Sequence, residues 1–179
     1  MKICILGSGT WGTALSHVLV NNKQNVSVWS RNVPANKINS IYYFTDLNEI
    51  SNFNILIIAL PSQVVNHIFD KIIPLINSKT MIVNASKGFD RKSMNPISLT
   101  LFKKFNIKES NYFVISGPSH AEEVLSNIPT ALVLASKNNE QSILLQKIFS
   151  NEFFRIYTTS DVIGLEIAAS CKNIISIAA

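Results

Sequence analysis

The sequence predicts an α/β protein built on a doubly wound, mostly parallel sheet. Short apolar runs of strand length alternate with segments of helical periodicity along the 179 residues, and no linker or internal repeat interrupts them. The first run, residues 2–6, leads into a glycine-rich stretch and then into a helical segment. A parallel sheet connected in this way carries helices on both of its faces.

Each expected strand is a run of apolar, β-branched or aromatic residues. These runs lie at 2–6, 26–29, 42–44, 55–60, 80–85, 112–115, 130–135 and 153–157. The run Ile55–Leu60 contains no polar residue, as in a strand buried on both faces, and Pro61 ends it. The run 42–44 is the weakest of the eight.

Each expected helix is a segment whose apolar residues recur every three or four positions. These segments lie at 11–22, 46–52, 62–76, 96–105, 119–125, 139–149 and 161–178. Asp46 is suited to cap the second helix, and Pro96 fits the first turn of the fourth. The last helix is long and apolar, and residues 174–179 carry no stop signal. We therefore expect that the chain is cut and that a second domain or subunit normally covers this helix.

Composition excludes several classes of protein. Hydrophobic residues make up 47% of the chain and charged residues 15%, which argues against disorder and against a charged coiled coil. The net charge of +5 is scattered without a basic stripe, so we expect no nucleic-acid partner. No apolar run has the length of a membrane span. Two distant cysteines and the absence of a leader favour the cytoplasm, and three widely spaced histidines give no metal site.

The glycine-rich stretch Gly7-Ser8-Gly9-Thr10-Trp11-Gly12 follows a strand and opens a helix. Gly7 permits the tight turn, Gly9 lets the backbone approach a pyrophosphate, and Gly12 lets helix and strand pack closely. The free amides at the helix N-terminus then face the phosphates. This context predicts a dinucleotide-binding fold of the Rossmann type, with a purely structural turn as the alternative.

The end of the second strand selects the cofactor in such folds. An acidic residue there would bind the ribose of NAD, but this chain has Trp29-Ser30-Arg31. Arg31 is suited to clamp a 2′-phosphate, which favours NADP. A solvated arginine at a strand end is the alternative reading.

Two lysines are candidates for chemistry. Lys87 lies in Ala85-Ser86-Lys87-Gly88, directly after a strand, where ligands of open α/β sheets bind. Lys172 lies in the apolar last helix, where burial would lower its pKa and make it an acid or base near neutral pH. An ordinary surface lysine is the alternative at position 87, and a lysine whose head reaches water is the alternative at position 172. Glu166, six residues before Lys172, does not share its helix face closely.

Six motifs in order resemble the bacterial type of NAD(P)-dependent glycerol-3-phosphate dehydrogenase. They cover nearly the whole chain: Gly7–Leu15, Trp29-Ser30-Arg31, Ala59-Leu60-Pro61-Ser62, Ala85–Gly88, Ser116–Val124 and Phe154–Asn173. The resemblance implies reduction of dihydroxyacetone phosphate to sn-glycerol 3-phosphate for phospholipid synthesis, with NADPH or NADH as cofactor. It also implies a homo-oligomer at full length.

The resemblance also implies roles for individual residues. The cofactor positions are Gly7, Gly9, Thr10, Trp11, Gly12, Arg31, Lys87 and Ala121. The substrate positions are Lys87, Gly117, Ser119 and Lys172, and Lys172 is also the catalytic position. On this reading, residues 1–160 form the nucleotide-binding domain, and 161–179 begin an all-helical substrate domain that is otherwise absent.

Four departures from the family bear on activity more than on fold. The helical domain is missing, the segment between Arg31 and Thr45 is short, Ala168–Cys171 is bulkier than the usual glycines, and His120 replaces a usual aromatic residue. One alternative is therefore a truncated, catalytically inactive module that binds NAD(P). Another is a different reductase of the same superfamily, of the ketopantoate or hydroxyacyl type, which the motifs Ser116–Ser119 and Lys172-Asn173 argue against.

Overall fold

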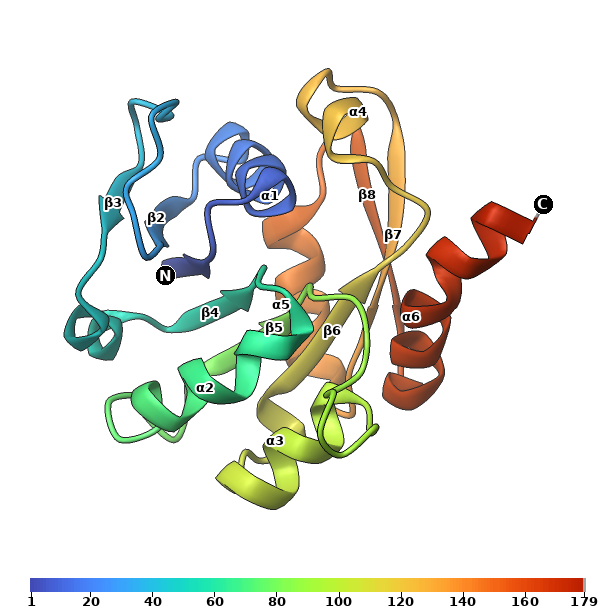
Figure 1. Cartoon of the computed structure of the whole chain (residues 1–179). Coiled ribbons are helices and arrows are strands. Elements are labelled where there is room, and N and C mark those ends of the chain that lie inside the picture. The colour runs from blue at the N-terminus through green and yellow to red at the C-terminus, as the bar shows by residue number, and fades with distance from the viewer. Residues whose placement is uncertain (179) are drawn as a thin grey trace.

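The structure is a computed structural model and describes residues 1–178. Its centre is one sheet of eight strands in the order β3-β2-β1-β4-β5-β6-β7-β8 (Figure 1). The strands are β1 Lys2–Leu6, β2 Asn25–Trp29, β3 Tyr42–Phe44, β4 Ile55–Ile58, β5 Met81–Asn84, β6 Tyr112–Ser116, β7 Thr130–Ala135 and β8 Phe154–Thr159. Only the β6–β7 pair is antiparallel, so the predicted doubly wound, mostly parallel sheet of the Rossmann type is confirmed.

Helices cover both faces of this sheet. They are α1 Thr10–Asn21, α2 Ser62–Ile72, α3 Ile97–Phe105, α4 Ala121–Leu125, α5 Asn139–Phe149 and α6 Val162–Ala178, with short 3₁₀ helices η1 Leu47–Asn52 and η2 Glu109–Asn111. Apolar residues of α1, α4 and α5 pack in one core layer with Ile3 and Ile5 of β1. Those of α2, α3 and the start of α6 pack in the other layer with Cys4 and Leu6. Successive residues of a strand point to opposite faces, which explains this division.

Two helices differ from their expected bounds by more than one residue. The segment 62–76 ends as a helix at Ile72 because Pro74 has no N–H to continue it. Leu75 instead donates to the carbonyl of Ile72 in a turn. The segment 119–125 becomes helical only at Ala121. The predicted cap at Asp46 is confirmed, since its side chain accepts a hydrogen bond from the amide of Asn48 at the start of η1.

The connection between β2 and β3 is short. Residues 30–41 link the two parallel strands without a helix. A parallel crossover needs about a dozen residues, so the connection is close to the minimum length. This connection lies in the segment between Arg31 and Thr45, which is shorter here than in the family that the sequence resembles.

Helix α6 is buried at its beginning and exposed at its end. Val162 and Ala169 are buried against the sheet, whereas Ile174 and Ile177 are 68% and 88% exposed. The end of the helix extends away from the sheet (Figure 1). Across residues 1–178, none of the helices has the length and apolar character needed to cross a membrane.

The free edge of β8 is covered by side chains that come from α5 and the turn after it. Gln146 donates to the carbonyl of Ile156 at 2.7 Å, and Ser150 accepts from the amide of Ile156 at 3.3 Å. Asn151 accepts from the amide of Phe154 at 2.7 Å through its side chain. Main-chain groups of the last strand are therefore hydrogen-bonded although β8 has a neighbouring strand, β7, on one side only.

Candidate functional site

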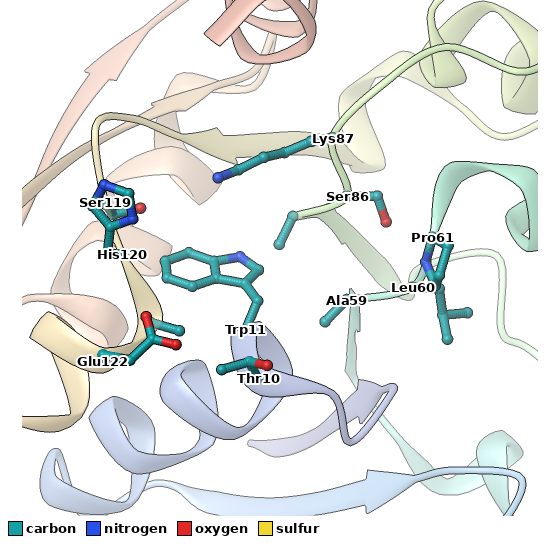
Figure 2. A pocket seen from close by; sticks show the side chains of 12 residues that line it. Thr10, Trp11, Ala59, Leu60, Pro61, Ser86, Lys87, Ser119, His120 and Glu122 are labelled. Carbon is teal, nitrogen blue, oxygen red and sulfur yellow. The ribbon is translucent and has the colours of Figure 1, made fainter. Parts of the chain in front are cut away.

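A cleft of about 420 Å³ lies at the carboxyl ends of the central strands (Figure 2). The strand order reverses between β1 and β4, and ligands of open α/β sheets bind outside such a reversal. The cleft is lined by residues that follow β1, β4, β5 and β6: Thr10, Trp11, Ala59, Leu60, Pro61, Ala85, Ser86, Lys87, Ser119, His120, Ala121 and Glu122. Four separate segments of the chain thus meet around one space.

Two of the three glycines in the turn after β1 are required by packing. Gly7 has φ +115°, and a Cβ there would lie 2.5 Å from the carbonyl oxygen of Ala59. A Cβ on Gly12 would lie 2.1 Å from the carbonyl oxygen of Gly7. These positions therefore bring β1, α1 and the end of β4 close together, as the sequence predicts.

Gly9 is different because nothing in the protein crowds it. A Cβ at this position would meet no atom within 4 Å, and its φ of −70° suits any residue. Gly9 is the N-cap of α1, and no side chain caps this helix. The first turn of α1 also contains no acidic residue. Helix amides without a partner at an N-terminus form an anion-binding site.

Trp11 lies in the middle of the cleft. Figure 2 shows its indole between Ser119 and His120 on one side and Ala59 and Pro61 on the other. The ring packs partly against the core. Its Nε1 atom is buried and has no hydrogen-bond partner among the described residues. A buried donor without a partner is costly, so this indole is suited to donate to a bound ligand.

Lys87 and Lys172 approach each other beside the indole. The Lys87 ammonium lies 5.7 Å from the centre of the Trp11 ring. Lys172 donates from Nζ to the carbonyl oxygen of Ser119 at 2.8 Å. Partial burial lowers the pKa of Lys87, and the positive charge of Lys172 lowers it further. Two neighbouring ammonium groups repel each other, and an anion between them would relieve that repulsion.

The structure brings together most of the residues that the sequence analysis singles out. Thr10, Trp11, Lys87, Ser119 and Ala121 line the cleft. Gly7, Gly9 and Gly12 form the turn at its base, and Lys172 reaches it through Ser119.

Two predicted residues lie differently. Arg31 is exposed beyond the end of β2 and does not line the cleft. The turn and β2 are neighbours nevertheless, since the amide of Gly7 donates to the carbonyl of Trp29 at 2.8 Å. Gly117 has a packing reason to be glycine, because a Cβ there would lie 2.7 Å from Cδ2 of Leu132 in β7.

Sequence reasoning gave no role to seven of the twelve residues that line the cleft. These are Ala59, Leu60 and Pro61 after β4, Ala85 and Ser86 after β5, and His120 and Glu122 beside α4. Most have small or apolar side chains, which carry no chemical signal of their own. The rule that ligands bind at carboxyl ends of strands, which singled out Lys87 after β5, would also have found the residues after β4.

Comparison with known proteins gives one consistent family. The sequence model described as "NAD-dependent glycerol-3-phosphate dehydrogenase N-terminus" matches residues 2–46 and 39–142. The two matches overlap at residues 39–46, which include the end of the short connection and β3. The chain is 36% identical to a glycerol-3-phosphate dehydrogenase [NAD(P)+] of Carboxydothermus hydrogenoformans, with 99% of this chain and 58% of the relative covered. It is 38% identical to that of a Thermotoga species, with 100% and 57% covered.

A solved structure agrees with these relatives. The crystal structure of glycerol-3-phosphate dehydrogenase from Coxiella burnetii superposes with a TM-score of 0.87 at 32% identity, covering 99% of this chain and 59% of that protein. The chain thus spans somewhat more than half the length of the relatives that it matches. It belongs to the NAD-dependent glycerol-3-phosphate dehydrogenase family and corresponds to the N-terminal part of that family's members.

Proposed function

We propose that this chain is the nucleotide-binding part of an enzyme that reduces dihydroxyacetone phosphate to sn-glycerol 3-phosphate with NADPH or NADH. The observation that carries the proposal is the space in front of Gly9. Packing and backbone conformation would both accept a side chain there, so the protein has no internal reason for a glycine. A pyrophosphate that approaches the uncapped amides of α1 supplies that reason.

The other residues of the cleft fit the same cofactor. The partnerless Nε1 of Trp11 supplies a donor, and Thr10 and Ala121 line the walls beside it. Arg31 lies on the β2 side, where it can meet the adenosine end and favour NADPH through a 2′-phosphate.

Lys87 and Lys172 have different roles toward the substrate. When bound, the nicotinamide ring supplies the hydride that reduces the ketone. Lys87 and the residues Gly117 and Ser119 bind the phosphorylated substrate, since Lys87 is a partly buried cation beside the Ser119 segment. Lys172 directs its ammonium at the same segment. There it stabilises the negative charge that develops on the substrate oxygen and gives that oxygen a proton.

A second candidate function is an inactive module that binds NAD(P) without turnover. The observation in its favour is that the chain spans only 57–59% of the relatives' length. Both candidates need the cofactor site, and they differ in whether substrate is held well enough to react. The cytoplasmic location, the role in phospholipid synthesis, the oligomeric state and the domain boundary at residues 160 and 161 stay predictions.

The test of the cofactor site is NADPH binding by the chain and its Gly9→Val variant. Quenching of tryptophan fluorescence reports binding, because Trp11 lies in the cleft. We expect the variant to keep the wild-type circular dichroism spectrum and to lose binding by at least a hundredfold. That loss corresponds to about two hydrogen bonds to a charged group, each worth about 1.5–3 kcal/mol. Unchanged affinity in a folded Gly9→Val variant would contradict the proposal.

A further inference from the structure

Glu166 of α6 is a buried carboxylate that binds three other elements of the fold. It is 5% exposed. Its Oε1 accepts hydrogen bonds from the side-chain amide of Asn84 at 3.2 Å, the backbone amide of Ser98 at 3.1 Å and the hydroxyl of Tyr112 at 2.8 Å. Its Oε2 accepts from the hydroxyl of Ser98. These partners lie at the end of β5, the start of α3 and the start of β6.

All four donors to this carboxylate are neutral groups. A buried charge is costly unless hydrogen bonds replace its hydration. Here four neutral donors replace the hydration of the Glu166 carboxylate. Burial and the charge of Glu166 both raise the pKa of Tyr112 well above its ordinary value, so its hydroxyl keeps the proton that it donates. The amide of Ser98 belongs to the first turn of α3, which favours negative charge. The network therefore fixes the Glu166 side chain in one place.

From this fixed point, hydrogen bonds lead to the segment that carries Lys87. Asn84 donates to Glu166 with its Nδ2 and accepts from the amide of Ser86 with its Oδ1, at 3.0 Å. Ser86 directly precedes Lys87 and is itself buried. An amide held at both of its ends cannot rotate, so the backbone before Lys87 is tied to the Glu166 carboxylate.

The same residue anchors the helix that carries Lys172. Glu166 holds α6 against the sheet, and Lys172 lies six residues further along the same helix. A straight helix rises about 1.5 Å per residue, so a fixed Glu166 also sets how far Lys172 reaches along the sheet edge. There its Nζ donates to Ser119 at 2.8 Å.

We propose that Glu166 is a positioning residue that sets the distance between the ammonium groups of Lys87 and Lys172, by holding Asn84 on one side and helix α6 on the other. Its significance for catalysis rests on the proposed function, whereas the geometric claim concerns the two lysines alone. No role for Glu166 follows from its position in the sequence, and the residue does not line the cleft.

The test measures how close the two lysines lie, without reference to activity. Lysine side chains of the chain are dimethylated with ¹³C-formaldehyde, and their methyl signals are followed by NMR as the pH is raised; Lys87→Arg identifies the signal of Lys87. In the unsubstituted chain Lys87 should titrate below the ordinary pKa of lysine, because it is partly buried and because Lys172 is near. In Asn84→Leu, which is close in size but cannot bond to Ser86, the Lys87 signal should titrate closer to the other lysines.

Three further variants complete the design. Ser98→Ala removes a bond of Glu166 outside the Asn84 connection, and it should leave the Lys87 titration unchanged. Glu166→Gln keeps an acceptor for Asn84, Tyr112 and the Ser98 amide, and its own amide can donate to the Ser98 hydroxyl. In this variant Lys87 should therefore titrate as it does in the unsubstituted chain. Glu166→Ala should behave like Asn84→Leu. If Glu166→Ala does not fold, the comparison of Asn84→Leu with Ser98→Ala and Glu166→Gln still decides the question.

Unchanged Lys87 titration in Asn84→Leu would overturn the proposal, and so would an equal shift in Ser98→Ala. NADPH binding by the same proteins separates this proposal from the proposed function. If the unsubstituted chain binds no NADPH while Asn84→Leu still shifts the Lys87 titration, the cofactor assignment fails and the role of Glu166 stands. If NADPH binds and the titration does not move, the role of Glu166 fails alone.

Discussion

Adding one methyl group at Gly12 should destabilise the fold, whereas the same change at Gly9 should not. At Gly12 the new Cβ would lie 2.1 Å from the carbonyl oxygen of Gly7. This neighbour is backbone in a tight turn, so the start of α1 must move away from β1. Overpacking of this kind costs about 1–3 kcal/mol of unfolding free energy.

At Gly9 the methyl group meets no atom within 4 Å. Replacing glycine by alanine at an N-cap costs up to about 1 kcal/mol. Alanine also lowers the conformational entropy of the unfolded chain, which stabilises the fold by about 0.4–1 kcal/mol, because alanine can adopt the φ of −70° found here. The two effects offset each other, and we expect a net change within about 0.5 kcal/mol.

Urea unfolding followed by circular dichroism measures both changes. With a slope of about 2 kcal/mol per molar urea, Gly12→Ala should lower the midpoint by roughly 1 M, and Gly9→Ala should leave it in place. NADPH binding should weaken in Gly9→Ala in spite of its unchanged stability. Equal losses of stability in the two variants would refute the reasoning, since Gly9 would then be required by packing like its neighbours.

Four more outcomes are expected. Lys172→Met should raise the pKa of Lys87 toward its ordinary value of 10.5, because a positive neighbour is removed. In the unsubstituted chain, inorganic phosphate should bind less tightly as the pH rises through the lowered pKa of Lys87, since the neutral amine no longer attracts an anion. A phosphate affinity that does not change with pH up to 10.5 would contradict this. Arg31→Ala should weaken NADPH on the order of tenfold and barely change NADH in fluorescence titrations, because only NADPH carries the 2′-phosphate, whereas equal losses would remove Arg31 from cofactor selection. The chain alone should oxidise NADPH with dihydroxyacetone phosphate negligibly, and it should gain turnover when the remaining part of a relative is appended. The reason is that positioning of the substrate lowers the activation barrier by about 7–11 kcal/mol. A turnover number of about 1–1000 per second for the chain alone would disprove this.

The parts of the fold that sequence predicts are those encoded over short distances. The strand, turn and helix around Gly7, Gly9 and Gly12 depend on residues a few positions apart, and their predicted bounds agree with β1 and α1 to within one residue. Lys87 was placed by a rule about strand ends that needs no tertiary information. The early end of α2 was also encoded locally, at Pro74, and could have been read from the sequence.

The parts that sequence reasoning did not reach depend on distant residues. The donors to Glu166 lie 54 to 82 positions away, and Lys172 reaches Ser119 across 53 positions. No helical spacing predicts such contacts, so Glu166 looked like an isolated charge on an apolar helix. Only the sheet order, which places β5 next to β6, the strand that α6 packs against, brings these partners together.

The side chains that cover β8 limit how copies of this protein can meet. An open strand edge invites another chain to add a strand, and proteins suppress this route to aggregation in several ways. Here Gln146 and Ser150 occupy the carbonyl and the amide of Ile156 that an incoming strand would need. Continuous sheets that run from one copy into the next through β8 are therefore disfavoured.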